Sequence, residues 1–180
     1  NLYQPLCAWH EKHNLLFSTI ATWGRQDIMG QTYHYGDYFR LCRWFHITGN
    51  EDPGSSEPGG RCFIDAKLSS SILHLYQRER AAMCVYWGAG HGVTQEENLA
   101  WTNENYAYGL NMYNTHGGLY GSLGSWYEWV PPSVHFRQPY WEHWKSFVDY
   151  VARLSAVLSQ GVHRADVALL YPLTSIHANW

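Results

Sequence analysis

The chain has 180 residues, of which 46% are hydrophobic and 17% aromatic, enough to form the core of one folded domain. A formal net charge of −3 offers no basic surface for nucleic acid, whereas ten tryptophans and fourteen tyrosines favour a carbohydrate ligand. No apolar run approaches the roughly 20 residues of a membrane span. We therefore expect neither a nucleic-acid partner nor a membrane partner.

Strand-like and helix-like segments alternate along the chain. Apolar runs rich in β-branched and aromatic residues predict strands, at Leu15–Thr22, Phe45–Thr48, Ala81–Trp87, Leu110–Thr115 and Asp166–Tyr171. Apolar residues at helical spacing predict helices that end near Asn14 and that cover Tyr38–Phe45, Cys62–Gln77, the stretch after Thr94, and Pro139–Gln160. Thr94 with Glu97 three residues later forms a capping box, which gives Glu97 a structural role. We expect the stretch Trp23–Gly36 to be a loop.

This alternation predicts right-handed crossovers and a parallel sheet, and so one α/β unit over residues 1–180. Long, decorated loops follow the strands while short ones precede them, which favours a (β/α)8 barrel over the alternative, an open doubly wound sheet. A whole barrel needs about 250 residues, so we expect the second half of one, a piece of a larger catalytic barrel that the remaining strands complete. An isolated half would expose two sheet edges and would dimerise or aggregate.

The predicted fourth strand runs into a loop rich in groups that recognise sugars. Amide and imidazole groups bond hydroxyls, and indole faces stack on the apolar side of a pyranose. A glycine-rich loop after the third strand adds one histidine and has no phosphate-binding spacing. We predict substrate-binding roles for Asn111, Asn114, His116, Trp126, Trp129 and His91. The alternatives are core packing for the tryptophans and loop-bracing hydrogen bonds for the polar residues.

Carboxylates in the loops that follow strands are candidates for acid–base chemistry. Glycoside hydrolysis generally uses two carboxyl groups, about 5–5.5 Å apart for retention and about 6.5–9.5 Å apart for inversion. Glu51, Asp52 and Glu128 lie in such loops and are the predicted catalytic residues, whereas Glu96 and Glu97 begin a helix. For Glu51 and Asp52 the alternative is a solvated turn.

The four cysteines, Cys7, Cys42, Cys62 and Cys84, are scattered and form no CxxC pair. Their spacing predicts thiols rather than a zinc or redox motif, and we predict no metal-ligating residues. The first residues, Asn1 to Pro5, have no signal-peptide layout. The protein would be periplasmic or extracellular if a signal sequence lay upstream.

Taken in order and spacing, several short motifs resemble the C-terminal half of the catalytic barrel of α-L-rhamnosidase-type glycoside hydrolases, family 106 and relatives. The resemblance covers nearly the whole chain and rests on Gly36–Phe39, Gly49–Gly54, Gly109–Asn111 with His116, Pro131–Pro132, Tyr150–Ser155 and Ala165–Pro172. It implies a glycosidase, inverting, with carboxylates at the strand ends, a plant or microbial glycan as substrate, and calcium as a cofactor.

One position departs from the pattern of these enzymes. Where they place a Ser–Glu pair at the end of a strand, this chain has Met83 and Cys84. A thiol, with an ordinary pKa of about 8.5 and weak hydrogen bonds, cannot protonate a glycosidic oxygen as a carboxylic acid does. The alternative function is therefore a carbohydrate-binding, catalytically impaired relative with Cys84 in place of an acid. A non-sugar α/β enzyme would need a nucleophile elbow or a nucleotide fingerprint, and the sequence has neither.

Overall fold

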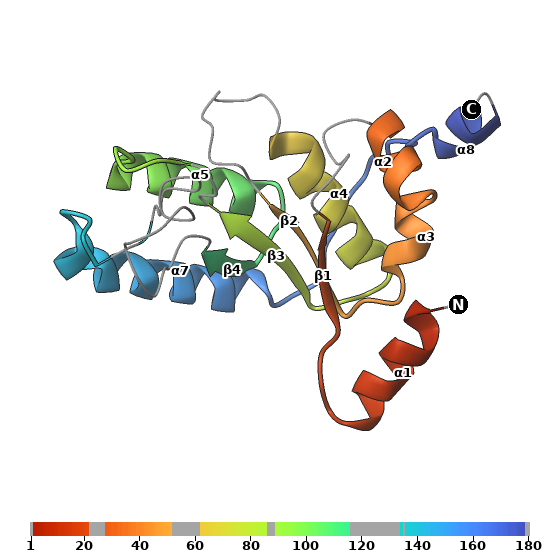
Figure 1. The fold of residues 1–180 in the computed structure, drawn as a ribbon, viewed down its shortest axis with the longest axis horizontal. Helices are drawn as coiled ribbons and strands as arrows, with labels where there is room; N and C mark the ends of the chain where they lie inside the picture. The colour runs from red at the N-terminus through yellow and green to blue at the C-terminus, as the bar shows by residue number, and fades with distance from the viewer. Residues whose placement is uncertain are drawn as a thin grey trace, which may run out of the picture.

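A four-stranded parallel sheet lies at the centre of the molecule (Figure 1). The computed structural model describes residues 2–21, 28–51, 62–85, 89–115, 134 and 136–178. The strands are β1 (Ser18–Ala21), β2 (Ile47–Glu51), β3 (Arg80–Val85) and β4 (Met112–Thr115), and they pair in chain order β1-β2-β3-β4. Sequential parallel order with helical connections is the arrangement of half of a (β/α)8 barrel. The predicted fold class is confirmed.

Helices precede, connect and follow the strands, and three of them cover one face of the sheet. They are α1 (Tyr3–Lys12), α2 (Ile28–Tyr35), α3 (Tyr38–Cys42), α4 (Cys62–Leu75), α5 (Gln95–Ala107), α7 (Trp144–Leu158) and α8 (Leu173–Ala178), with a 3-10 turn η1 (Trp141–His143) before α7. Helix α4 packs on β2 and β3, α5 on β3, and α7 on β4. The expected helices over Cys62–Gln77 and Pro139–Gln160 thus correspond to α4 and to η1 with α7.

The main core lies between the sheet and helices α4, α5 and α7. Met83 and Val85 of β3 are fully buried there, against Leu73 of α4 and Phe147 of α7. The Tyr106 hydroxyl of α5 donates to the Val151 carbonyl and lies 2.6 Å from Ser155 Oγ, which ties α5 to α7. Apolar residues at helical spacing predicted this packing, because they give each helix one apolar face that must be buried.

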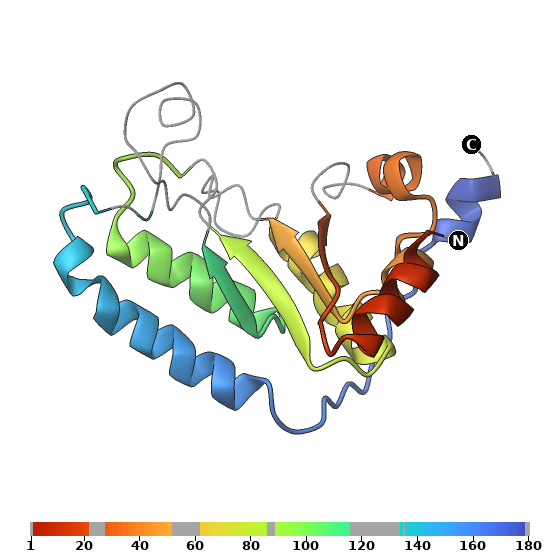
Figure 2. The ribbon, with the colours of Figure 1, turned by 60° about the horizontal axis from the view of Figure 1, so that its bottom comes forward.

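Two predictions about the connections are wrong. The stretch Trp23–Gly36 was expected to be a loop, but Ile28–Tyr35 forms helix α2. The fifth strand, Asp166–Tyr171, is not part of the sheet, and its Val167, Leu169 and Leu170 side chains are 77%, 90% and 91% exposed. Strand-like composition does not make a strand without a backbone partner. In Figure 2 the chain after α7 passes the ends of the strands opposite their arrowheads and continues to α8.

Candidate functional site

Three residues form one row across the carboxyl ends of the strands. The register pairs Glu51 of β2 with Cys84 of β3, and Cys84 with Asn114 of β4. Neighbouring strands lie about 4.8 Å apart, so the backbones of Glu51 and Asn114 are about 10 Å apart with Cys84 between them. The carboxyl ends of parallel strands are where α/β proteins place their chemistry. This row is the candidate site.

The row lies on the face of the sheet that points away from the core. Met83 and Val85 of β3 project into the helix-covered core, so Cys84 between them projects to the other face. Asn114, in register with it, is exposed, whereas Cys84 itself is only 7% exposed between its neighbours. The corresponding face of a complete barrel is its interior, which puts the row at the top of that interior.

The row beneath it on the same face has two small residues and one large one. It consists of Gly49, Ala82 and Met112, in register across β2, β3 and β4. Glycine and alanine raise little bulk above the backbone of β2 and β3, whereas the Met112 side chain is exposed on β4. The two small residues leave space for a ligand or for inward side chains of further barrel strands.

The structure separates one other predicted binding residue, Asn111, from this row. Asn111 lies at the start of β4, at the opposite end of the sheet, and is 4% exposed. Its side chain accepts a hydrogen bond from the Ala81 N–H and donates one to the Glu79 carbonyl, both 2.9 Å long. His91 is exposed in the turn between β3 and α5, which begins at the carboxyl end of β3, the end of the sheet that carries the row. The remaining predicted site residues lie outside the described residues: Asp52, His116, Trp126, Glu128 and Trp129.

The helix that follows β3 begins as predicted. Thr94 Oγ1 accepts from the Glu97 N–H, and Glu97 Oε2 accepts from the Thr94 N–H at 2.7 Å. This capping box occupies both groups and fixes the start of α5. Glu97 therefore has the structural role that its spacing indicated.

Cys84 was not among the predicted binding or catalytic residues, although the family resemblance put it where those enzymes have an acid. Its place between Glu51 and Asn114 depends on the register of three strands, which sequence spacing cannot supply. Cys7, Cys42 and Cys84 are thiols, as expected. Burial raises the pKa of the Cys42 thiol to about 12, so this one is inert.

Among the described residues one group brings three metal-ligand types together: Cys7 and Glu11 of α1, and His46 just before β2. His46 Nε2 lies 3.3 Å from Glu11 Oε1, and the Cys7 thiol donates to the same oxygen at 3.6 Å. His46 Nδ1, however, accepts a 2.9 Å hydrogen bond from the Phe17 N–H. A neutral imidazole that accepts at Nδ1 carries its proton on Nε2, which then donates to Glu11 instead of binding a metal. We interpret the group as a hydrogen-bonded cluster that holds α1 against the segment before β2.

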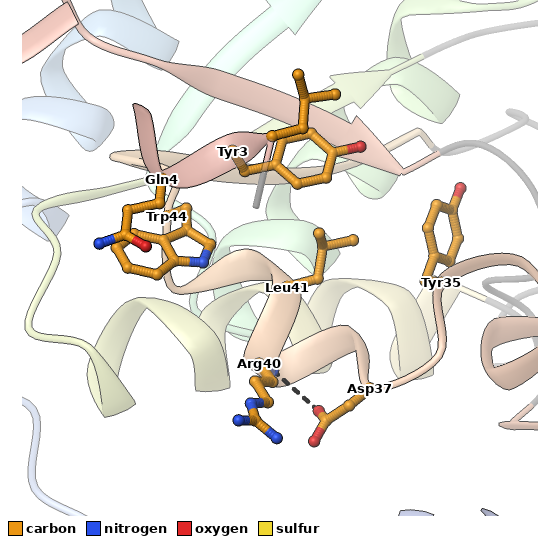
Figure 3. A pocket seen from close by; sticks show the side chains of 8 residues that line it. Tyr3, Gln4, Tyr35, Asp37, Arg40, Leu41 and Trp44 are labelled. Atoms are coloured by element: carbon orange, nitrogen blue, oxygen red, sulfur yellow. Dashed lines mark hydrogen bonds between the residues drawn. The ribbon is translucent and has the colours of Figure 1, made fainter. Parts of the chain in front are cut away.

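A hollow of about 270 Å³ lies between α1, α2 and α3 (Figure 3). Tyr3 and Trp44 form part of its wall, and Asp37 and Arg40 lie at its rim. The Asp37 carboxylate already accepts from the Arg40 N–H, 2.9 Å away, and so caps α3. The hollow is lined by helix and turn residues and lies apart from the row on the sheet.

Comparison with known proteins shows a similarity of fold to a solved structure. No family model and no curated protein matches the sequence. The structure is similar to that of a rhamnosidase from Novosphingobium sp. PP1Y, with a TM-score of 0.61 and 16% sequence identity over 89% of this chain. The chain spans 16% of that protein's length. At this identity the similarity shows a shared fold. None of the described helices has the length and hydropathy needed to span a bilayer.

Proposed function

We propose that the protein is a glycoside hydrolase of the α-L-rhamnosidase type. The observation that carries the proposal is the row of Glu51, Cys84 and Asn114 at the carboxyl ends of the strands, where barrel enzymes do their chemistry. The shared fold with a rhamnosidase supports the same class. The substrate would be a plant or microbial glycan, and further barrel strands would be the structural partner.

In this proposal Glu51 is one of the two carboxyl groups that act on the glycosidic bond. Asn114 lies on the same row and its amide would bind a sugar hydroxyl. Asp52 and Glu128 are the candidates for the second carboxyl group, and calcium stays an expectation from the family resemblance. An inverting reaction requires a separation of about 6.5–9.5 Å, which leaves room for the attacking water.

The test is hydrolysis of a chromogenic aryl α-L-rhamnoside by the purified protein. Glu51→Gln keeps the size of the side chain and removes its acid–base function, so turnover should fall at least a hundredfold. Glu96→Gln, an exposed glutamate in the first turn of α5, is the matched control and should keep wild-type turnover. Equal turnover in the two variants would remove Glu51 from the mechanism. The anomeric form of the first product, followed by NMR, distinguishes inversion from retention.

The sugar-binding loop after β4 provides a second test. His116→Ala and Glu128→Gln should each lower turnover or glycan affinity at least tenfold, about 1.4 kcal/mol, because a site built for a hydroxyl leaves polar groups unpaired when one partner is removed. Circular dichroism should show both variants folded. Unchanged kinetics and binding in both would exclude this loop from the site.

A carbohydrate-binding protein without catalysis is the second candidate, and Cys84 favours it. The thiol occupies the middle of the row, the position from which a carboxylic acid would reach a ligand held between Glu51 and Asn114. Calorimetry with rhamnose and rhamnosides separates the two functions: binding without turnover identifies the binding protein. In that case Cys84→Glu should create measurable hydrolysis. The control Cys42→Ala, which changes a cysteine buried between α3 and α4, should not.

A further inference from the structure

Two histidines from distant parts of the chain stack at the end of the sheet opposite the candidate site. His74 lies in the last turn of α4, and His163 lies in residues 161–171, the extended segment after α7 that we call the strap. Their ring centroids are 3.7 Å apart and the ring planes differ by 9°. The contact is therefore a face-to-face stack that joins the strap to α4.

The strap is attached at few points. At its far end Tyr171 packs against Phe39 of α3, with ring centroids 5.7 Å apart. Between Val162 and Leu170 every residue is exposed, and the strap belongs to no strand ladder of the described sheet. With so little else buried, the His74–His163 stack carries much of the attachment at the near end.

The strap also forms one wall of a cavity of about 850 Å³. Leu73 and Leu110 form its apolar floor, and Gly161, Val162 and His163 line the strap side. The cavity is already half-open, and displacement of the strap would widen its opening. The stack is thus placed where its making or breaking changes access to this cavity.

The charged groups that act on His74 are positive: His163 when protonated, and Lys67 of α4. Burial first, and then the charges of His163 and Lys67, lower the pKa of His74 to about 4. Two imidazolium rings held face to face repel each other, so the stack requires that at least one ring stays neutral. The titratable and charged groups on the elements around it are Lys67 on α4, Arg78 and Glu79 in the turn after α4, Tyr106 on α5, and Arg164 and Asp166 on the strap.

We propose that the His74–His163 stack is a pH-sensitive latch that keeps the strap closed over the cavity at neutral pH and releases it on acidification. The direction follows from linkage. His74 binds its proton less readily in the closed state than in an open one, where its pKa would return toward the ordinary 6.5. The closed state is therefore fully favoured above about pH 6.5 and loses that advantage as the pH falls toward about 4. The latch is independent of the proposed glycosidase function.

The experiment is a ¹H–¹⁵N and imidazole NMR titration of the whole chain from pH 7.5 to pH 4. In the wild type, amide signals of residues 161–171 should move together as His74 becomes protonated. The imidazole protons should also lose the ring-current shift of the stack. His74→Phe keeps a stacked ring that cannot be charged, so the strap signals should stay in place in this variant. His163→Phe removes the repulsion between the two rings but leaves the buried His74, so the strap signals should still move, at a lower pH than in the wild type. His13→Phe, which replaces a histidine stacked on Trp9 in α1, is the control and should titrate like the wild type.

Three results would overturn the latch. The first is a strap whose amide signals do not move in the wild type. The second is a movement of the strap signals in His74→Phe as large as in the wild type. The third is simultaneous loss of the Met83 and Val85 signals in β3, because the transition would then be global unfolding. Two variants, one on α4 and one on the exposed strap, keep the test valid if one of them folds poorly.

Discussion

Asn111 and Asn114 lie three residues apart in sequence, and their substitution by alanine should affect different properties. Asn111→Ala should lower stability, and Asn114→Ala should lower the affinity for the sugar. Asn111 is buried, and its amide accepts from the Ala81 N–H and donates to the Glu79 carbonyl. In Asn111→Ala the buried Ala81 N–H loses its partner, at a cost of about 1–3 kcal/mol. The space left by the amide adds about 1 kcal/mol. The free energy of unfolding should fall by about 2–4 kcal/mol, a large part of the 5–15 kcal/mol typical of a domain.

Urea unfolding followed by circular dichroism measures this loss, and thermal unfolding should show a midpoint roughly 4–16 °C lower. The slope of the free energy against urea concentration should not change, because the folded state stays equally compact. Asn114→Ala removes an exposed amide and should change stability by less than about 0.5 kcal/mol. Its effect should appear instead as an at least tenfold weaker affinity for the sugar.

A wild-type unfolding midpoint for Asn111→Ala would refute the reasoning, since the Ala81 N–H would then have another partner. A loss of stability in both variants would show that the Asn114 side chain is also buried in the folded protein. Loss of sugar affinity in Asn111→Ala at full stability would return Asn111 to the binding site. The pair thus separates a structural asparagine from a ligand-binding one on a single strand.

Four further variants test the packing of the helices and the strap. Thr94→Ala removes the cap of α5 and should cost about 0.5–2 kcal/mol in urea unfolding, with Thr94→Ser as the control that retains the cap. Tyr106→Phe removes the hydroxyl that donates to the Val151 carbonyl and contacts Ser155, and it should lower the free energy of unfolding in urea by about 1–2 kcal/mol. Leu169→Ser and Leu170→Ser should each change the free energy of unfolding by less than about 0.5 kcal/mol, because both side chains are exposed. The same substitutions in a buried strand would lower it by several kcal/mol. Sedimentation and urea unfolding distinguish the two cases.

Local sequence signals predicted the elements whose determinants are local. The capping box at Thr94 and Glu97 fixes the start of α5 through two hydrogen bonds within four residues, so spacing alone identified it. The apolar stripe of α7 places Trp144, Phe147 and Val151 in the core for the same reason. Leucine, valine and aromatic residues at helical spacing give a helix one apolar face, and that face is buried whichever element packs on it.

The errors concern segments whose state depends on distant partners. Ile28–Tyr35 lacks a strong apolar stripe, yet it is helical and packs against α8. Asp166–Tyr171 has the composition of a buried strand, but strands require hydrogen-bonding partners that composition does not specify. The strap is attached at its ends by the His74–His163 and Phe39–Tyr171 contacts instead. Tertiary contacts thus determine the conformation of both segments.

The candidate site shows the same division between local and distant information. Glu51 and Asn114 were predicted because each comes at the end of a strand-like run, a feature of one segment at a time. Cys84 became part of the site only when the register placed it between them. A shift by one residue in either pairing would move Cys84 to the helix-covered face. Register is set by packing of the whole sheet, which is why sequence spacing could not assign it.

The position of Cys84 also limits the chemistry that the row can perform. Two strand spacings of about 4.8 Å separate Glu51 from Asn114, so a pyranose held over the row would lie above the thiol. A thiol donates weakly and ordinarily titrates near pH 8.5, so the proton for a leaving oxygen must come from another group. The row itself offers one carboxylate and one amide, which suffice to orient a sugar but not to complete the acid–base pair. Catalysis therefore depends on a carboxyl group that reaches the row from a loop or from further barrel strands. A protein without that group would bind the same sugar and release it unchanged.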